Sequence, residues 1–244
     1  MSAETIYRQL IQASMTPAGA CGLMGNMQAE SGMKSNIAQR GMTVLSDEEY
    51  TAASAEWPVK FIHDGVGYGL CQWTYWSRKQ ALLSFARARG VSVGDEGMQV
   101  EFCVDELRDE YPALWCFLCE TQDVRAAAER VCKEYERPAV NNVDARAAYA
   151  NQFYSRLAGL AVPAAEETAA AETYWPPRVI CEGMNGDDVA VAQAILKARG
   201  GDVIITGEFD ARLKNRVMAW QSINGLAADG IIGAATWAAL LRRG

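Results

Sequence analysis

Apolar residues recur at helical spacing through much of the first 160 positions. The clearest stripe advances by four, three and four residues, through Val124, Ala128, Val131 and Tyr135. This spacing predicts a helix with one buried face. Thr121 is a suitable residue to cap its start, because a threonine hydroxyl can accept a hydrogen bond from a free amide of the first turn. We expect the helix to end before Pro138.

A second helix is predicted directly afterwards, from Asn142 to a stop at Gly159. Its predicted apolar stripe consists of Ala145, Tyr149, Phe153 and Leu157. Residues 79–89 and 98–110 also have helical patterns. Residues 40–70, by contrast, are rich in glycine, short polar residues and isolated aromatic residues, which favours loops and a small β-hairpin.

The chain is predicted to divide near residue 162. Residues 162–177, VPAAEETAAAETYWPP, lack a sustained apolar face and are typical of a linker. Three short helices are predicted beyond it, at 187–198, 210–222 and 233–242, next to glycine-containing turns. In the last of these, Trp237, Leu240 and Leu241 are predicted to face a core. We therefore expect a mainly α chain: a domain at 1–161, the linker, and a three-helix bundle at 178–244.

Composition excludes several partners. The net charge is −7 at pH 7, so the basic surplus that nucleic-acid binding requires is missing. Residues 1–20 contain no basic segment followed by an apolar run, and no stretch approaches the roughly 18 apolar residues of a membrane helix. The seven cysteines have no framework-like spacing. We expect synthesis without a signal peptide in a reducing cytoplasm, no membrane insertion, mostly free thiols and a monomer.

Glu30 is the first candidate for chemistry. In the segment GLMGNMQAESGMKSN (22–36), helical spacing places Glu30 on the same face as Leu23, Met24 and Met27. Apolar surroundings disfavour the charged form of a carboxyl group and so raise its pKa. A glutamate that keeps its proton near neutral pH can donate that proton to a glycosidic oxygen.

A second candidate region follows in FIHDGVGYGLCQWTYWSRKQ (61–80), where Asp64 precedes a glycine-rich turn. Glycines allow tight turns and a close approach of a ligand to the backbone. Gln72 supplies a polar amide after the turn. Flat aromatic side chains, which can stack on sugar rings, are frequent here: Tyr68, Trp73, Tyr75 and Trp76.

These motifs, in this order, resemble the goose-type lysozyme and lytic transglycosylase superfamily. The segments GNMQAESG, SDEEYT (46–51), DGVGYGLCQWTYWSRKQ and YERPAVNNVDARAAYANQFY (135–154) are more similar to phage tail lysozyme domains from phage lysins. The resemblance covers roughly residues 5–160. It implies an α+β lysozyme-like domain with a small hairpin lobe and an endolysin that acts on bacterial peptidoglycan after release from the producing cell.

The implied reaction is cleavage of the β-1,4 bond between N-acetylmuramic acid and N-acetylglucosamine. By resemblance, Glu30 matches the general acid, Asp64 the second carboxylate or base, and Gln72 a substrate-facing residue. Tyr68 and Trp73 are predicted as further substrate contacts from their flat aromatic faces. Thr74 stands where goose-type enzymes carry a second aspartate, so Asp64 is the better candidate for the base. If Asp64 lies too far away to act, a lytic transglycosylase reaction through Glu30 alone remains open.

The C-terminal segment resembles a different family, the three-helix peptidoglycan-binding domain. Its strongest portion runs from Gly225 through Asp229-Gly230-Ile231-Ile232-Gly233 to Trp237. Ala192 and Asp210 depart from residues that are usual in that family. Trp237 is expected in the core, so wall binding is assigned to the domain and to no single residue.

Two further functions are weighed against cleavage of glycan strands. Cys21 and the only histidine, His63, could in principle form a thiol peptidase, although a buried cysteine and an incidental histidine fit the pattern better. A non-catalytic wall-binding or virion protein is the other alternative. Cys116 and Cys119 form a CxxC without a second pair, so no metal site is expected, and no cofactor motif is present.

Overall fold

The computed structural model describes residues 3–39, 46–52, 60–160 and 179–242. Helices dominate these ranges, and the extended backbone is limited to isolated bridges. This confirms the prediction of a mainly α chain with a small hairpin lobe and a C-terminal three-helix region. Residues 162–177, the predicted linker, lie outside the described part of the chain.

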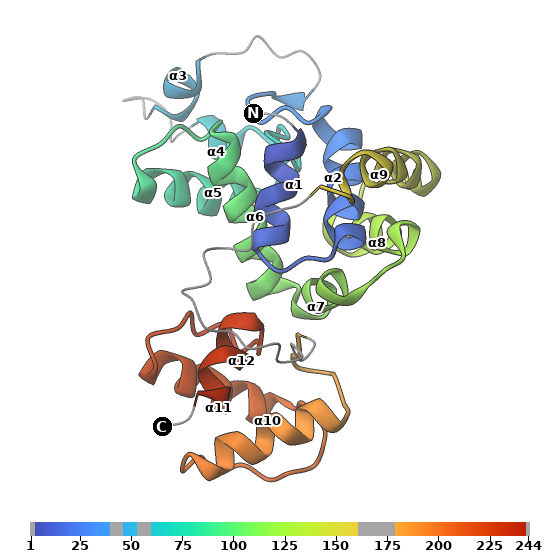
Figure 1. The fold of residues 1–244 in the computed structure, drawn as a ribbon. Coiled ribbons are helices and arrows are strands. Elements are labelled where there is room, and N and C mark those ends of the chain that lie inside the picture. Colours follow the sequence, from blue (N-terminus) through green and yellow to red (C-terminus); the bar gives the residue numbers. More distant parts are fainter. Residues whose placement is uncertain (1–2, 40–45, 53–59, 161–178, 243–244) are drawn as a thin grey trace.

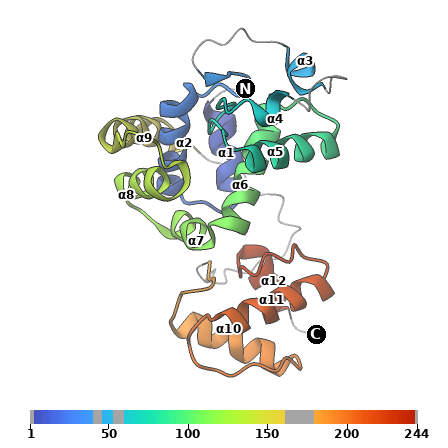
Figure 2. The same ribbon diagram turned by 180° about the vertical axis from the view of Figure 1, so that it is seen from behind.

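The first body is arranged around α2 (Pro17–Ser31), which Figures 1 and 2 show among the other helices. Most of α2 is buried, including Leu23, Met24 and Met27. Glycines at every third position let neighbours approach closely. A Cβ on Gly22 would lie 2.3 Å from the Ala127 side chain, and one on Gly25 would lie 2.5 Å from the Arg146 carbonyl oxygen. The predicted apolar stripe is therefore only part of the buried surface of α2, because this helix is buried on nearly all sides.

Three helices pack against α2 from the later part of the domain. They are α7 (Pro112–Glu120), α8 (Val124–Arg130) and α9 (Val143–Leu157). The buried stripe of Val124, Ala128, Val131 and Tyr135 is confirmed, but Asp123 rather than Thr121 caps α8. The last turns of that predicted helix form a π-helix, η2 (Val131–Glu136).

The face of α9 differs from the expected stripe. Phe153 and Leu157 are buried as expected, but Tyr149 is exposed. The buried side of the helix contains Arg146, Ala147 and Ala150 instead. The offset has a physical cause: the small Ala150 fits the close approach at Gly25, where a tyrosine would not fit.

The other side of the body contains α1 (Ala3–Gln12), α5 (Trp76–Arg89) and α6 (Glu96–Glu110), with two short helices, α3 (Asp47–Thr51) and α4 (Lys60–His63). The minimal hairpin lies among them. Tyr68 pairs with Trp73 across the turn 69–72, and Ala38 pairs with Tyr68 on the other side. The amide oxygen of Gln99 on α6 accepts a hydrogen bond of 2.9 Å from the Leu70 amide, which fixes the turn on the helix.

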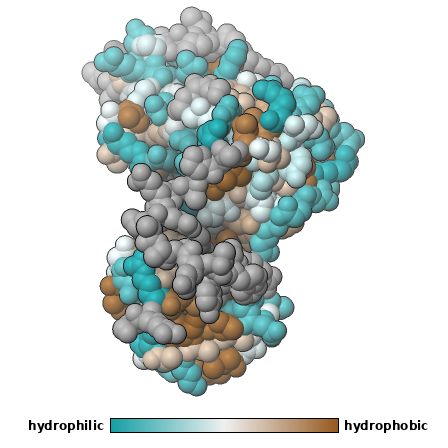
Figure 3. Space-filling view, viewed as in Figure 1, coloured by the Kyte–Doolittle hydropathy of each residue, from teal (hydrophilic) through white to brown (hydrophobic). Residues whose placement is uncertain are grey.

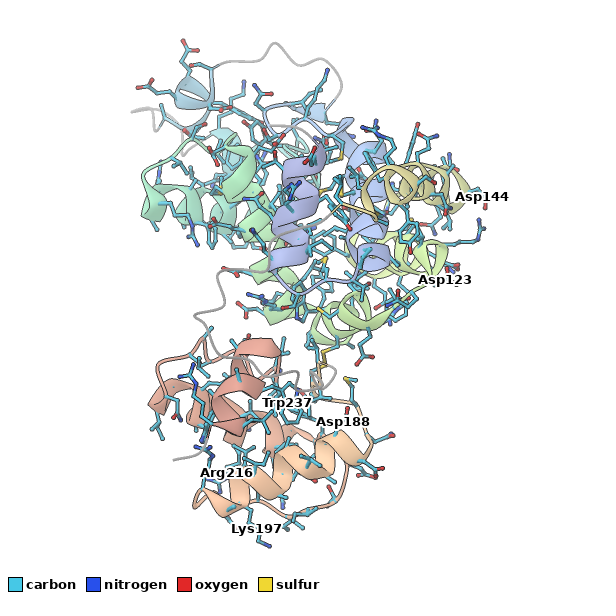
Figure 4. The ribbon with its side chains drawn as sticks, viewed as in Figure 1. Asp123, Asp144, Asp188, Lys197, Arg216 and Trp237 are labelled. Carbon is cyan, nitrogen blue, oxygen red and sulfur yellow. A yellow bond between two sulfur atoms is a disulfide. The ribbon has the colours of Figure 1, made fainter. Side chains whose placement is uncertain are left out.

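The C-terminal body contains α10 (Asp187–Ala198), α11 (Ala211–Ile223) and α12 (Ala234–Leu241), close to the predicted ranges. It has its own apolar cluster, in which Trp237 lies toward α10 (Figure 4). Leu240 is buried with it, whereas Leu241 is 41% exposed, so the prediction for Leu241 was wrong. Asp229 and Gly230 form the expected turn, with a φ of 71° at Gly230.

A disulfide joins the two bodies, between Cys116 on α7 and Cys181 before α10. The sequence predicts mostly free thiols, which agrees with one disulfide among seven cysteines, but it did not predict that Cys116 pairs with Cys181. The other five cysteines are free and buried: Cys21, Cys71, Cys103, Cys119 and Cys132. Among the described residues, no helix has both the length and the apolar character to cross a membrane.

Candidate active site

Glu30 lies in the last turn of α2, which Gly32 ends in the left-handed conformation with a φ of 64°. Its side chain is 19% exposed. The next residue fixes this helix end to the hairpin, because the Ser31 hydroxyl lies 3.0 Å from both the Met27 and the Leu70 carbonyl oxygens. Glu30 is therefore held where the helix meets the hairpin, with part of its side chain open to solvent.

The sequence did not predict the charged partner of Glu30. Nη2 of Arg146 donates a hydrogen bond of 2.6 Å to Oε1 of Glu30, and Nη1 of the same guanidinium donates to Oδ1 of Asn26 at 3.0 Å. Arg146 is 5% exposed. The Asn26 amide in turn donates to the Gly22 and Ala128 carbonyl oxygens. This chain of contacts fixes the Glu30 carboxylate relative to α8 and α9.

Asp64 has a different environment from the one expected for a free base. Nζ of the completely buried Lys79 donates to Oδ1 of Asp64 at 2.7 Å, and the Val66 amide donates to the same oxygen at 3.0 Å. The Tyr50 hydroxyl donates to the other oxygen, Oδ2. Burial lowers the pKa of Lys79, and the charge of Asp64 opposes that shift. These contacts tie together α3, α5 and the segment that follows α4.

The four aromatic residues of the hairpin region separate into two groups. Tyr68 and Trp73 are completely buried, whereas Tyr75 is 64% and Trp76 54% exposed. The Tyr68 hydroxyl donates to Asp47, and the Trp73 indole donates to Glu106. Tyr68 and Trp73, predicted as substrate contacts, thus pack the underside of the hairpin and present no face to a bound sugar. The aromatic rings that are exposed to solvent are those of Tyr75 and Trp76.

Gln72 lies at the hairpin turn with a φ of 47°, a left-handed conformation that is uncommon for a residue other than glycine. Its amide nitrogen donates to the Ile37 and Gly69 carbonyl oxygens at 3.2 and 2.8 Å. Strained backbone of this kind is typical of sites where a side chain has a fixed task. The observed contacts also give Gln72 a role in closing the turn.

Beneath the hairpin lies a buried ion pair that sequence analysis missed. Arg78 on α5 makes two hydrogen bonds to Glu106 on α6, at 2.6 and 2.7 Å. Glu106 also accepts hydrogen bonds from the Tyr135 hydroxyl at 2.6 Å and from the Trp73 indole at 3.0 Å. The carboxylate of Glu106 therefore joins α5, α6, η2 and the hairpin. No local sequence signal distinguishes it from the other acidic residues of α6.

Glu136, the last residue of η2, is also an acidic residue of this region. Burial raises its pKa to about 8, and the neighbouring charge of Glu30 acts in the same direction, while Arg78 and Arg146 act in the opposite direction. Glu136 lies in the YERP segment, but nothing in its spacing indicated a buried carboxyl group. π-Helices are frequent at functional sites, so its position there is consistent with a site residue.

Cys21 and His63 do not form a catalytic pair. Cys21 is completely buried in α2, and burial raises the pKa of its thiol to about 12. His63 is exposed at the end of α4. A peptidase needs a reactive thiolate next to its base, and the environment of Cys21 opposes thiolate formation.

Two family models match the chain. The model described as phage tail lysozyme matches residues 1–157. The model described as a putative peptidoglycan binding domain matches residues 185–240. The first match contains Glu30, the hairpin, Glu136 and Arg146, and the second contains α10, α11 and most of α12.

Proposed function

Because the chain belongs to the phage tail lysozyme family, we propose that it is a muramidase that cleaves the β-1,4 bond between N-acetylmuramic acid and N-acetylglucosamine. Glu30 is the proton donor to the glycosidic oxygen. The observation that carries this assignment is the fixed position of the carboxyl group, which the Arg146 guanidinium and the Ser31 contacts hold between α2 and the hairpin. Positioning of this kind is what general acid catalysis requires.

Hydrolysis requires a second group that activates water, whereas a lytic transglycosylase reaction does not. The sequence predicts Asp64 as the base that activates water, but Lys79, Val66 and Tyr50 already donate to its oxygens. These contacts support a structural role and leave Glu30 as the better exposed carboxylate. A lytic transglycosylase reaction through Glu30, in which the sugar closes on itself without water, is therefore the second candidate.

Substrate contacts are assigned to the start of α5, directly after the hairpin. Tyr75 and Trp76 expose their rings next to each other, with centroids 6.3 Å apart, and sugar rings stack well on such faces. Gln72 lies at the turn that precedes them in the chain. This assignment replaces Tyr68 and Trp73, whose rings are buried.

The C-terminal domain is proposed to hold the enzyme on peptidoglycan. A groove of about 640 Å³ lies between the loop at 202–206 and the start of α11, where Asp202, Thr206, Arg212 and Arg216 supply polar groups. Apolar residues gather on the face of this body that is shown in Figure 3. An exposed apolar patch of this kind can contact a wall polymer. The proposed setting is that of an endolysin, which acts as a monomer on the wall after release from the cytoplasm in which it is made.

The Glu30→Gln variant tests the proposed chemistry. The amide of this variant cannot donate the proton, so digestion of purified peptidoglycan should fall by at least about 100-fold, while co-sedimentation with insoluble wall stays unchanged. Mass spectrometry of the soluble fragments distinguishes the two reactions, since hydrolysis leaves reducing muramic acid ends and transglycosylation leaves 1,6-anhydro ends. Digestion at the parental rate by the Glu30→Gln variant, or fragments cut only in the peptides, would overturn the assignment.

A further inference from the structure

The groove of the C-terminal body has a lining that distinguishes between the two components of peptidoglycan, the sugar strands and the peptides attached to them. None of the described residues that line it is aromatic. Sugar rings stack well on flat aromatic faces, and the strongly exposed rings of Tyr75 and Trp76 lie on the first body instead. Apolar side chains contribute to the groove, namely Val203, Ile204 and Leu213. The groove is therefore better suited to a peptide than to a sugar strand.

One buried side chain fixes the loop that borders this groove. Gln193 on α10 is 2% exposed, and its amide oxygen accepts hydrogen bonds from the Thr206 and Gly207 amides at 2.9 and 2.8 Å. Its amide nitrogen donates to the Thr206 hydroxyl and to the Glu208 carbonyl oxygen, both at 3.0 Å. Ile204 of the same loop lines the groove and is 70% exposed. An apolar contact is thus presented on a loop that is already ordered, which lowers the entropic cost of binding.

Four charged residues line the groove, and three of them already have a polar partner. Arg216, labelled in Figure 4, forms an ion pair with Asp202 in which Nη2 lies 3.3 Å from Oδ2. Asp210 caps α11, where its Oδ1 accepts a hydrogen bond of 2.8 Å from the Leu213 amide, and the positive end of the helix offsets its charge. Within the described part of the chain, Arg212 has no ion pair or hydrogen bond. Its guanidinium is exposed and favours an anionic ligand group.

A neutral donor lies on the same side of α11 as Arg212. Asn215 follows three positions later and also lines the groove, and its side chain has no hydrogen-bond partner among the described residues. Residues three positions apart are neighbours on the surface of a helix. A carboxylate can accept two parallel hydrogen bonds from a guanidinium and a further one from an amide. The helix therefore supplies donors for a carboxylate, while the loop opposite supplies the apolar Ile204.

We propose that this groove binds the free carboxyl end of a wall peptide, with the carboxylate on Arg212 and Asn215 and the side chain of the terminal amino acid on Ile204. The inference rests on the proposed wall-binding role of the C-terminal domain and names the component that the domain recognises. Uncrosslinked peptides of bacterial peptidoglycan end in D-alanine, whose methyl group suits a contact with isoleucine. The two domains then contact different parts of the substrate, the first the sugars and the second the peptide end.

Binding of short soluble peptides to the full chain tests the proposal, because such peptides contain no glycosidic bond to cleave. An NMR titration compares a peptide that ends in D-alanyl-D-alanine with the same peptide amidated at its C-terminus. We expect a Kd about tenfold lower for the free acid, since amidation removes the charge that Arg212 binds, and Arg212→Gln should abolish this preference. The matched control is Lys197→Gln, which should keep it, because Lys197 is an exposed cation in the last turn of α10 and does not line the groove (Figure 4).

Sedimentation in the cold with insoluble material separates this inference from the proposed function. Two materials are compared, intact wall and wall glycan from which an amidase has removed the peptides. Arg212→Gln should bind intact wall several-fold more weakly than the parent and bind the peptide-free glycan equally well. If the parent sediments with wall but binds the free acid and the amide equally, or if Arg212→Gln weakens binding to both materials alike, the peptide site is wrong and wall binding stands. If the parent does not sediment with intact wall, the wall-binding role itself fails.

Discussion

Arg146 donates a hydrogen bond of 2.6 Å to Glu30, although 116 positions separate the two residues in the sequence. The contact forms because α9 packs along α2, where Gly25 leaves room for the backbone of α9 at Arg146. The same guanidinium also binds Asn26, one turn earlier on α2. A planar group with several donors can satisfy both acceptors at once and so fixes the direction of the Glu30 side chain.

The Arg146→Lys variant should therefore separate charge from geometry. Lysine keeps the positive charge but cannot reach Glu30 and Asn26 in the same fixed fork. We expect kcat for wall digestion to fall by roughly tenfold to 100-fold, because a small displacement of the acid is costly. Arg156→Lys, on the exposed side of the same helix, is the control and should keep the parental rate. A parental kcat in Arg146→Lys would show that the fork geometry is unimportant.

Asp64 and Lys79 should contribute to stability as a pair. Removal of one partner leaves the other charge buried, so Asp64→Asn and Lys79→Met should each lower the free energy of unfolding by about 3–5 kcal/mol. The double variant Asp64→Leu/Lys79→Met should regain most of that stability, since no charge of the pair remains buried. Urea unfolding measures all three variants.

The same variants test whether Asp64 is also the base. Wall digestion is measured at a temperature where each protein is folded. If the role of Asp64 is structural, the double variant should digest wall within about tenfold of the parental rate. Loss of at least about 100-fold in a folded double variant would instead return Asp64 to the chemical step.

The raised pKa of Glu136 predicts how stability depends on pH. The pKa in the folded protein is about 8, above the ordinary value of 4.5. As pH rises from about 4.5 to 8, the unfolded chain loses this proton while the folded protein retains it, so the contribution of Glu136 to stability falls through that window. Glu136→Gln removes the effect, and its stability relative to the parent should increase across the window.

The difference in unfolding free energy between Glu136→Gln and the parent should change by about 2 kcal/mol between pH 5 and pH 8. This is less than a pKa shift of this size would give for a fully buried group, because part of the Glu136 side chain reaches solvent. Urea unfolding of both proteins at pH 5 and pH 8 provides the measurement, and other titrating groups largely cancel in the comparison. An equal stability difference at the two pH values would contradict the raised pKa.

The disulfide predicts a count of reactive thiols. Denatured protein that has not been reduced should expose five thiols, because Cys116 and Cys181 are joined. After reduction the count should rise to the seven cysteines of the sequence. Titration with a thiol reagent gives both values, and mass spectrometry of a non-reduced digest should contain the linked peptides. Seven thiols before reduction would show that the bodies are joined by the backbone alone.

Local features of the chain were predictable from the sequence. The three C-terminal helices follow from apolar spacing and from turns such as Asp229-Gly230, whose left-handed glycine is needed whatever packs against it. The helical segment that contains Glu30 follows from similar short-range signals, whereas the hairpin, which was expected within residues 40–70, forms between Tyr68 and Trp73. The helix predictions depended on neighbouring residues alone, which explains why the structure reproduced them closely.

The sequence predicted less well which side chains of a helix or hairpin are buried and which are exposed. Tyr68 and Trp73 point inward while Tyr75 and Trp76 point outward, and composition is the same in both pairs. Tyr68 and Trp73 lie in the hairpin, whose turn is held on α6 by the contact between Gln99 and Leu70, whereas Tyr75 and Trp76 lie at the start of α5. Tyr149 and Arg146 on α9 show the same limit for a helix, since close packing at Gly25 selects the buried side.

The sequence by itself determined the three C-terminal helices and several helices of the first domain, and it placed Glu30 in a helical segment that precedes a glycine-rich turn, because backbone propensity and turn chemistry are local. Tertiary structure alone decided that Arg146 binds Glu30 and that Lys79 and Tyr50 donate hydrogen bonds to Asp64. It also decided that a carboxyl oxygen of Glu136 is buried without a hydrogen-bond partner among the described residues. Charge pairing and desolvation depend on which side chains meet in space, and those side chains come from segments far apart in the chain.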